Sequence, residues 1–165
     1  MVKLVVTGAA EDVNLADIGE LEHSIHRILL PTDGSEPSVK ATQYAVMLAK
    51  LLGASITAIY VDTGMEGIEL PEELTSDDYY EGVHPSAKGL IIAYRVAQAN
   101  GVDCDIDIVR GGVAKRIVAT AESLGAGMIV IGDTGRTGLK RIALGSVAEA
   151  VVKASEAPVL VIKAD

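Results

Sequence analysis

Cysteine, large aromatic side chains and long apolar runs are scarce in this sequence. Its 165 residues include one cysteine, Cys104, and neither tryptophan nor phenylalanine. A single cysteine excludes an intrachain disulfide, a redox pair and a metal site built from several cysteines. We expect Cys104 to be a small apolar residue buried in a strand. No apolar run approaches the roughly 18 residues that cross a bilayer.

Basic residues are also few. The 14 Lys and Arg are outnumbered by 23 Asp and Glu, which gives a net charge of −9 at pH 7. This charge repels nucleic acid and anionic membranes, so we expect neither as a partner, although a local cationic pocket could hold one small anion. The N-terminus turns acidic after about ten residues, unlike a signal peptide. We therefore expect a soluble, cytoplasmic protein.

The hydrophobic content of 49% suits one compact core. We expect a single domain over residues 26–165. Residues 1–25 form an N-terminal extension with a short apolar run, "KLVV", and one or two turns of helix around Leu15 to Glu22. An added edge strand, an arm for a partner and a poorly ordered tail are all open for this segment.

Short β-branched runs alternate with helical segments along the rest of the chain. The near-continuous apolarity of these runs predicts buried parallel strands. We expect these strands to form an open, doubly wound α/β sheet of five strands with helices on both faces, in the order 3-2-1-4-5 or 2-1-3-4-5. The strand candidates are "RILLPTD", "SITAIYV", "DCDIDIV", "GMIVIGD" and "PVLVIK"; the helices are expected at Ser35–Gly53, Ser86–Asn100, Ala114–Leu124 and Ser146–Ser155.

An acidic interval separates the second strand from the second helix. Residues 62–87 contain no lysine or arginine and are crowded with Asp and Glu. We expect an exposed loop there, with a lid or a partner-facing surface as the alternative. The histidines at positions 23, 26 and 84 are expected to be surface residues rather than metal ligands.

Ligands of open α/β sheets bind beyond the carboxyl ends of the strands, so two loops are the places to look. The first loop, "PTDGSEPS", follows the first strand. Its Asp33 could accept hydrogen bonds from a sugar or a base, or could cap the following helix beside Ser35.

The second loop, "VIGDTGRTGLKRIALGSVAE", follows the fourth strand. Its glycines permit close backbone approach, and Gly145 and Ser146 lie where the last helix begins, with free N–H groups and the positive end of the dipole. Ser146 could cap that helix and donate its hydroxyl to a phosphate, while Arg136, Lys140 and Arg141 add positive charge. Glycine content alone leaves a phosphate site and a flexible connection both open.

Standard nucleotide and catalytic motifs are missing. The sequence contains no G-x-x-x-x-G-K-[ST], and its glycines do not form G-x-G-x-x-G after the first strand. A P-loop NTPase and a dinucleotide-binding dehydrogenase are therefore disfavoured. No specific signature locates a Ser-His-Asp or paired-carboxylate site, so we name no catalytic residue.

The spacing within the second loop resembles a known signature. Gly132, two residues, Gly135, nine residues and then Gly145-Ser146 are similar to the G-x2-G-x9-G-[ST] pattern of nucleotide-binding universal stress proteins. The stretches "RILLPTDGSEPS", "YAVMLAKLLGASITAIYVD" and "GRTGLKRIALGSVAEAVVKASEAPVLVIK" also look like that family. The resemblance covers about Arg27 to Lys163.

The resemblance implies the 3-2-1-4-5 order, a homodimer formed through the C-terminal strand, and ATP or AMP at the switch between strands one and four. Matched position by position, one group of residues would border the adenosine, a second would follow the ribose and phosphates, and a third would donate backbone N–H groups. These groups are Pro31, Thr32, Asp33 and Val61; Gly132, Thr134 and Gly135; and Gly145, Ser146, Val147 and Ala148, which would also offer the Ser146 hydroxyl. Arg136 is a further expected binding residue through its charge.

Asp133 departs from the family pattern, in which small, hydroxylated or basic residues are common at this position. A carboxylate beside a triphosphate repels it unless the side chain turns away or a divalent cation, Mg²⁺ or Mn²⁺, bridges the two. Asp133 therefore bears on the choice between ATP and AMP.

The function predicted is that of an adenine-nucleotide-binding regulatory or stress-response protein with at most slow ATP hydrolysis. The alternatives are an ATP-using hydrolase or transferase on the same fold, which would lack the usual S-G-G-x-D-S motif, and a nucleotide-free dimerisation module, against which the glycine signature argues.

Overall fold

A computed structural model describes residues 25–64, 67, 85–134 and 144–163. The first 24 residues, most of the acidic interval and residues 135–143 lie outside these ranges, as do the expectations that fall on them. Strands and helices alternate along the described chain. In order they are β1 (Arg27–Pro31), α2 (Glu36–Leu52), β2 (Ser55–Asp62), α3 (Pro85–Ala99), β3 (Cys104–Arg110), α4 (Val113–Leu124), β4 (Met128–Gly132), α5 (Ser146–Ala154) and β5 (Val159–Ile162).

The strands form one parallel sheet in the order β3-β2-β1-β4-β5. In the central pair Ile28 of β1 lies opposite Met128 of β4, and β1 also pairs along its whole length with β2. The chain thus leaves β1 toward β2 on one side, and it later returns through β4 on the other side. The prediction of an open, doubly wound sheet is confirmed, and the order 2-1-3-4-5 is excluded.

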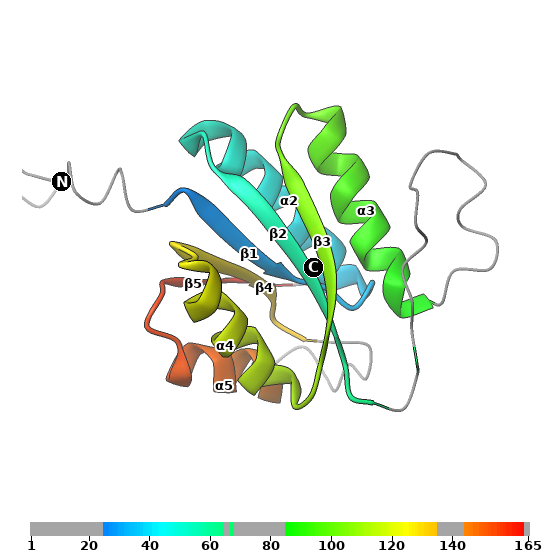
Figure 1. Cartoon of the computed structure of the whole chain (residues 1–165), viewed down its shortest axis with the longest axis vertical. Helices are drawn as coiled ribbons and strands as arrows, with labels where there is room; N and C mark the ends of the chain where they lie inside the picture. Colours follow the sequence, from blue (N-terminus) through cyan, green and yellow to red (C-terminus); the bar gives the residue numbers. More distant parts are fainter. Residues whose placement is uncertain (1–24, 65–66, 68–84, 135–143, 164–165) are drawn as a thin grey trace, which may run out of the picture.

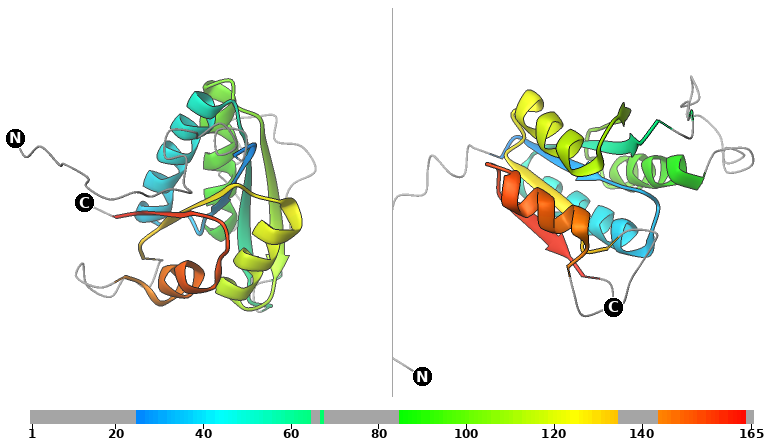
Figure 2. Two further views of the ribbon diagram at one scale, coloured as in Figure 1. Left: turned by 90° about the vertical axis from the view of Figure 1, so that its left-hand side faces the viewer. Right: turned by 90° about the horizontal axis from the view of Figure 1, so that it is seen from below.

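Helices cover both faces of the sheet. Figures 1 and 2 show α2 and α3 on one face and α4 and α5 on the other. Alternate strand residues supply the two resulting cores: Ile28 and Leu30 of β1 point toward α2 and α3, whereas Leu29 points toward α4 and α5. All three side chains are fully buried, and each such burial contributes roughly 1.5–3 kcal/mol.

The ends of α2 agree with the prediction from the sequence except in one detail. Pro37 lies in the first turn, and Gly53 closes the helix in the left-handed conformation with φ of 66°, which glycine adopts without steric cost. Ser35 is the N-cap residue, but its side chain makes no capping hydrogen bond. Its backbone N–H instead donates to Oδ1 of Asp33 at 3.0 Å, so the carboxylate arranges this helix start.

The remaining helices begin and end within a residue or two of their expected positions. Within the described ranges, no helix is both long and apolar enough to cross a membrane. Cys104 lies at the start of β3, half-buried against the first core. Burial, with a smaller contribution from the charge of Asp105, raises the pKa of its thiol to about 12, which favours the neutral thiol at neutral pH. The expected place in a strand is confirmed, but Cys104 is half-buried and not fully buried.

Candidate functional site

The candidate site lies at the carboxyl ends of β1 and β4, where the strand order reverses. Because β1 and β4 are parallel neighbours, the loops after Pro31 and Gly132 leave the same edge of the sheet. The start of α5 lies at this edge too, since Gly145 N donates to the carbonyl oxygen of Asp133 at 2.7 Å. This hydrogen bond joins the end of β4 to the beginning of the last helix.

Glycine is required at Gly132 and Gly145 by close contacts. A Cβ at Gly145 would lie 2.7 Å from the carbonyl oxygen of Asp133, and one at Gly132 would lie 2.9 Å from the carbonyl carbon of Pro37. Neither glycine has a positive φ. The glycine at each position therefore permits close backbone approach, the role that the sequence predicts for glycine in this loop.

The beginning of α5 presents backbone donors without acceptors in the helix. The first helical hydrogen bond runs from Glu149 N to Gly145 O at 2.9 Å, so the N–H groups of residues 146–148 have no acceptor within the helix itself. The N-cap residue is Gly145, and no side chain caps the helix. The expectation that Ser146 caps α5 is wrong, because Ser146 is already the first helical residue; its exposed position leaves its hydroxyl open to a ligand.

The charge of Glu149, one turn into α5, is paired with Lys153. This hydrogen bond and the charge of Lys153 lower the pKa of the Glu149 carboxyl. The pairing directs Glu149 toward the later part of the helix, so the positive end of the helix dipole is the nearer charge for an anion at Gly145.

The loop after β1 is held by hydroxyl groups. Thr32 N donates to Ile59 O at 2.9 Å, and the buried Thr32 hydroxyl donates to Ser38 Oγ at 3.1 Å. The half-buried Asp33 accepts from Ser35 N. This hydrogen bond orients the Asp33 carboxylate at this edge of the sheet, where it could accept further bonds from a ligand.

Gly89 of α3 supports the same loop and was missed by the sequence reasoning. A Cβ at this position would lie 2.5 Å from Oγ1 of Thr32 and 2.6 Å from the backbone N of Gly34. The only sequence signal is a glycine in a helix interior, which costs about 1 kcal/mol and calls for a packing reason. The reason is the contact between α3 and the loop.

Val61 and Asp62 end β2, beside β1. Val61 is buried in the second core, two residues beyond Ile59, which pairs with Pro31. Asp62 was counted with the exposed acidic interval, and this placement is wrong, since its side chain is fully buried. Asp62 Oδ1 accepts from Gly64 N at 2.8 Å, and Arg110 lies 3.7 Å from Oδ2, so Asp62 anchors the end of β2 instead of facing solvent.

Asp133 follows directly after β4. Its backbone N–H donates to Ile162 O at 2.8 Å, and its Oδ1 accepts from the hydroxyl of Thr134 at 3.2 Å. Thr134 therefore holds the Asp133 carboxylate near the start of α5, because the backbone carbonyl oxygen of Asp133 accepts the hydrogen bond from Gly145 N.

The structure thus brings most of the expected site residues to one edge of the sheet. Gly135 and Arg136, with Lys140 and Arg141, lie outside the described residues, and the binding role of every residue stays a prediction. The residues placed at this edge are Pro31, Thr32, Asp33, Val61, Gly132, Thr134, Gly145, Ser146, Val147 and Ala148.

Comparison with known proteins agrees with this arrangement. The model of the universal stress protein family matches residues 24–163. The chain belongs to the universal stress protein family. A universal stress protein of Methanocaldococcus jannaschii, MJ0531, is 39% identical to it, over 86% of this chain and 84% of that protein.

Solved structures share the fold of this universal stress protein. The structure of protein MJ0577 superposes with a TM-score of 0.67 at 30% identity, covering 86% of this chain and 98% of that one. A universal stress protein in complex with cAMP has a TM-score of 0.64 at 24% identity, covering 86% and 99%. A universal stress protein from Archaeoglobus fulgidus in complex with dAMP has a TM-score of 0.61 at 21% identity, covering 84% of this chain and 98% of that one. The last two likenesses concern the fold alone.

Proposed function

We propose that this universal stress protein binds an adenine nucleotide, ATP or AMP, at the switch between β1 and β4. Nucleotide occupancy would regulate a partner or a stress response in the cytoplasm, with at most slow hydrolysis of ATP. Among the described residues the histidine is His26, which lies exposed before the opposite end of β1. It therefore lies at the end of the sheet away from the proposed site.

The observation that carries the proposal is the contact between Gly145 and Asp133. It holds the N–H groups at the start of α5 against the end of β4. Oriented backbone donors at a helix N-terminus bind phosphate, and hydrogen bonds to a charged group contribute roughly 1.5–3 kcal/mol each. The phosphates would therefore lie at Gly145–Ala148, with the hydroxyl of Ser146 as a further donor.

The adenosine would lie toward β1 and β2. Asp33 has a fixed orientation because it accepts from Ser35 N, and its carboxylate can accept from a ribose hydroxyl or an adenine amino group. Pro31 and Val61 supply apolar contacts beside it. The two structures of this fold that were solved with cAMP and dAMP support an adenine nucleotide by analogy of fold.

The binding proposal is tested on the purified protein. Nucleotide released by denaturation should be identified as ATP or AMP, and a calorimetric titration of the nucleotide-free protein should show one site per chain. A protein that releases no nucleotide, and that neither binds ATP or AMP in calorimetry nor melts at a higher temperature with either, would contradict the proposal.

Asp133→Asn is expected to change the preference between ATP and AMP. Asparagine keeps the Oδ1 acceptor used by Thr134 but removes the charge that would repel a triphosphate. Without a divalent cation, ATP should bind roughly 3–10-fold more tightly and AMP nearly as before. The gain in ATP affinity that Mg²⁺ or Mn²⁺ brings should become smaller. An equal change for ATP and AMP would show that Asp133 does not sense the outer phosphates.

We also propose that the protein is a homodimer formed through the C-terminal strand. β5 pairs with β4 on one side and lies at the end of the described sheet, so its other edge can pair with a second copy. Light scattering after size exclusion should give about twice the chain mass of 17.1 kDa. A mass of one chain at micromolar concentration would contradict the dimer without affecting the nucleotide site.

A further inference from the structure

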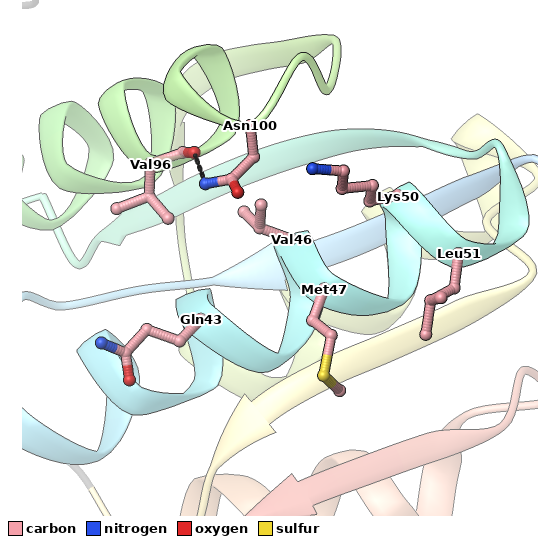
Figure 3. A pocket seen from close by; sticks show the side chains of 7 residues that line it. All are labelled: Gln43, Val46, Met47, Lys50, Leu51, Val96 and Asn100. Carbon is pink, nitrogen blue, oxygen red and sulfur yellow. Dashed lines mark hydrogen bonds between the residues drawn. The ribbon is translucent and has the colours of Figure 1, made fainter.

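An open groove runs between α2 and α3, on the side of these helices that faces away from the sheet, and none of the predicted nucleotide-binding residues lines it (Figure 3). Its volume is about 550 Å³. Val46 and Val96 belong to the first core at its floor, while Met47 and Leu51 are 48% and 74% exposed. The lining residues are Gln43, Val46, Met47, Lys50, Leu51, Val96 and Asn100.

The chain enters β1 beside one end of this groove. Ser55, three residues after the end of α2, donates its backbone N–H to His26 O at 2.9 Å. Figure 1 shows β1 beginning on the side of the molecule where α2 ends. Ile25 packs against the first core, the same cluster that forms the groove floor. Ile25 is therefore at the same end of the molecule as the C-terminal end of α2.

The sequence of that segment suits the groove. Leu15, Ile18, Leu21 and Ile25 would fall within a sector of about 120° on a helix, at 100° per residue, so Ile25 would continue one apolar stripe. From Gln43 to Leu51 the groove follows about 12 Å of α2, and eight residues such as 15–22 span about the same length as a helix. The family model begins at residue 24, so the segment is an addition to the family domain.

The charges are also complementary. Residues 1–24 contain five acidic side chains and one lysine, and 1 − 5 gives a net charge of −4. The exposed Lys50 lies on the groove, and Glu22 would share the apolar side of the helix. We propose that residues 13–24 of this chain dock as an amphipathic helix in the α2–α3 groove, with Leu15, Ile18 and Leu21 against Met47 and Leu51.

Hydrogen exchange of the full-length protein, read by mass spectrometry, tests this docking. Amides of residues 13–24 should exchange at least about tenfold more slowly than an unstructured chain. Leu51→Asp should abolish this protection while the strands keep theirs. Val152→Asp is the matched control, since Val152 is an apolar residue of α5 that is 45% exposed, and it should leave residues 13–24 protected. Unprotected residues 13–24 in the wild type, or protection that survives Leu51→Asp, would overturn the proposal.

The same experiment distinguishes other occupants of the groove. If a second copy covered it, protection around Met47–Leu51 would rise with protein concentration while residues 13–24 stayed unprotected, and the proposal would be wrong. If an external partner covered it, both segments would exchange freely in the pure protein, which would also overturn it. None of these outcomes depends on nucleotide binding.

A charge exchange tests the register. Lys50→Glu should lower the protection of residues 13–24 about two- to threefold, as expected for an exposed ion pair, and Glu22→Lys in the same chain should restore it. If residues 13–24 are no better protected in the double variant than in Lys50→Glu alone, the placement of Glu22 beside Lys50 would be overturned.

Discussion

Gly145→Ala is expected to weaken ATP binding by roughly 10- to 100-fold, or about 1.4–2.8 kcal/mol. The added Cβ would lie 2.7 Å from the carbonyl oxygen of Asp133 and 3.3 Å from Cα of Thr134. Both contacts are with backbone, which no side-chain rotation relieves, so the start of α5 must move away from β4. Because the proposed phosphate donors belong to that helix start, they move with it. Calorimetric titration measures the loss.

Gly112→Ala is the matched control for Gly145→Ala. Gly112 is the N-cap of α4 with φ of −68°, close to the φ of −62° at Gly145, and a Cβ there meets nothing within 4 Å. Its ATP affinity should equal that of the wild type. If both variants bind ATP like the wild type, the contact between Gly145 and Asp133 does not position the phosphate donors.

Gly89→Ala is expected to lower both the free energy of unfolding and the affinity for nucleotide. At an open helix position the same substitution would stabilise the protein by up to about 1 kcal/mol. Here the Cβ would overlap Thr32 Oγ1 at 2.5 Å and Gly34 N at 2.6 Å. Overpacking of this kind costs roughly 1–3 kcal/mol. Displacement of the loop also moves Asp33, so ATP affinity should fall about tenfold. Denaturant unfolding and calorimetry measure the two effects.

Gln98→Gly separates these two effects. Gln98 is an exposed residue in the last turn of the same helix, and glycine there lowers stability by at most about 1 kcal/mol through helix propensity alone. Its ATP affinity should not change. A Gly89→Ala variant that is more stable than the wild type, or one that binds ATP normally, would contradict the role of Gly89 in positioning the loop.

The sequence predicted the layers of this fold better than its finer contacts. Apolar runs such as those of β1 and β4 are buried on both faces, and their composition alone indicates a parallel sheet. Composition does not say which strands are neighbours, so the order 3-2-1-4-5 had to come from the family resemblance. The glycine at position 53 was a dependable local signal because a left-handed helix end is a property of the glycine and its immediate neighbours.

The contacts that shape the candidate site are not local, and the sequence could not predict them. Gly89 approaches a loop more than 50 residues earlier in the chain. Ser146 looked like a cap, yet Gly145, which is hydrogen-bonded to Asp133, is the N-cap and Ser146 is the first helical residue. Asp62 is acidic like the residues of the interval that follows it, so its sequence gives no sign of burial. The pairing of β2 with β3 places it beside Arg110. Each of these depends on tertiary packing.

The most direct test of a nucleotide site at the switch between β1 and β4 is an NMR titration of the ¹⁵N-labelled, nucleotide-free protein with ATP. We expect saturable shifts of the backbone amides of Ser146–Ala148 and of Gly34, and no specific shifts of Gln43 and Asn100 in the α2–α3 groove. Saturable shifts confined to the groove, or none at the start of α5, would contradict it.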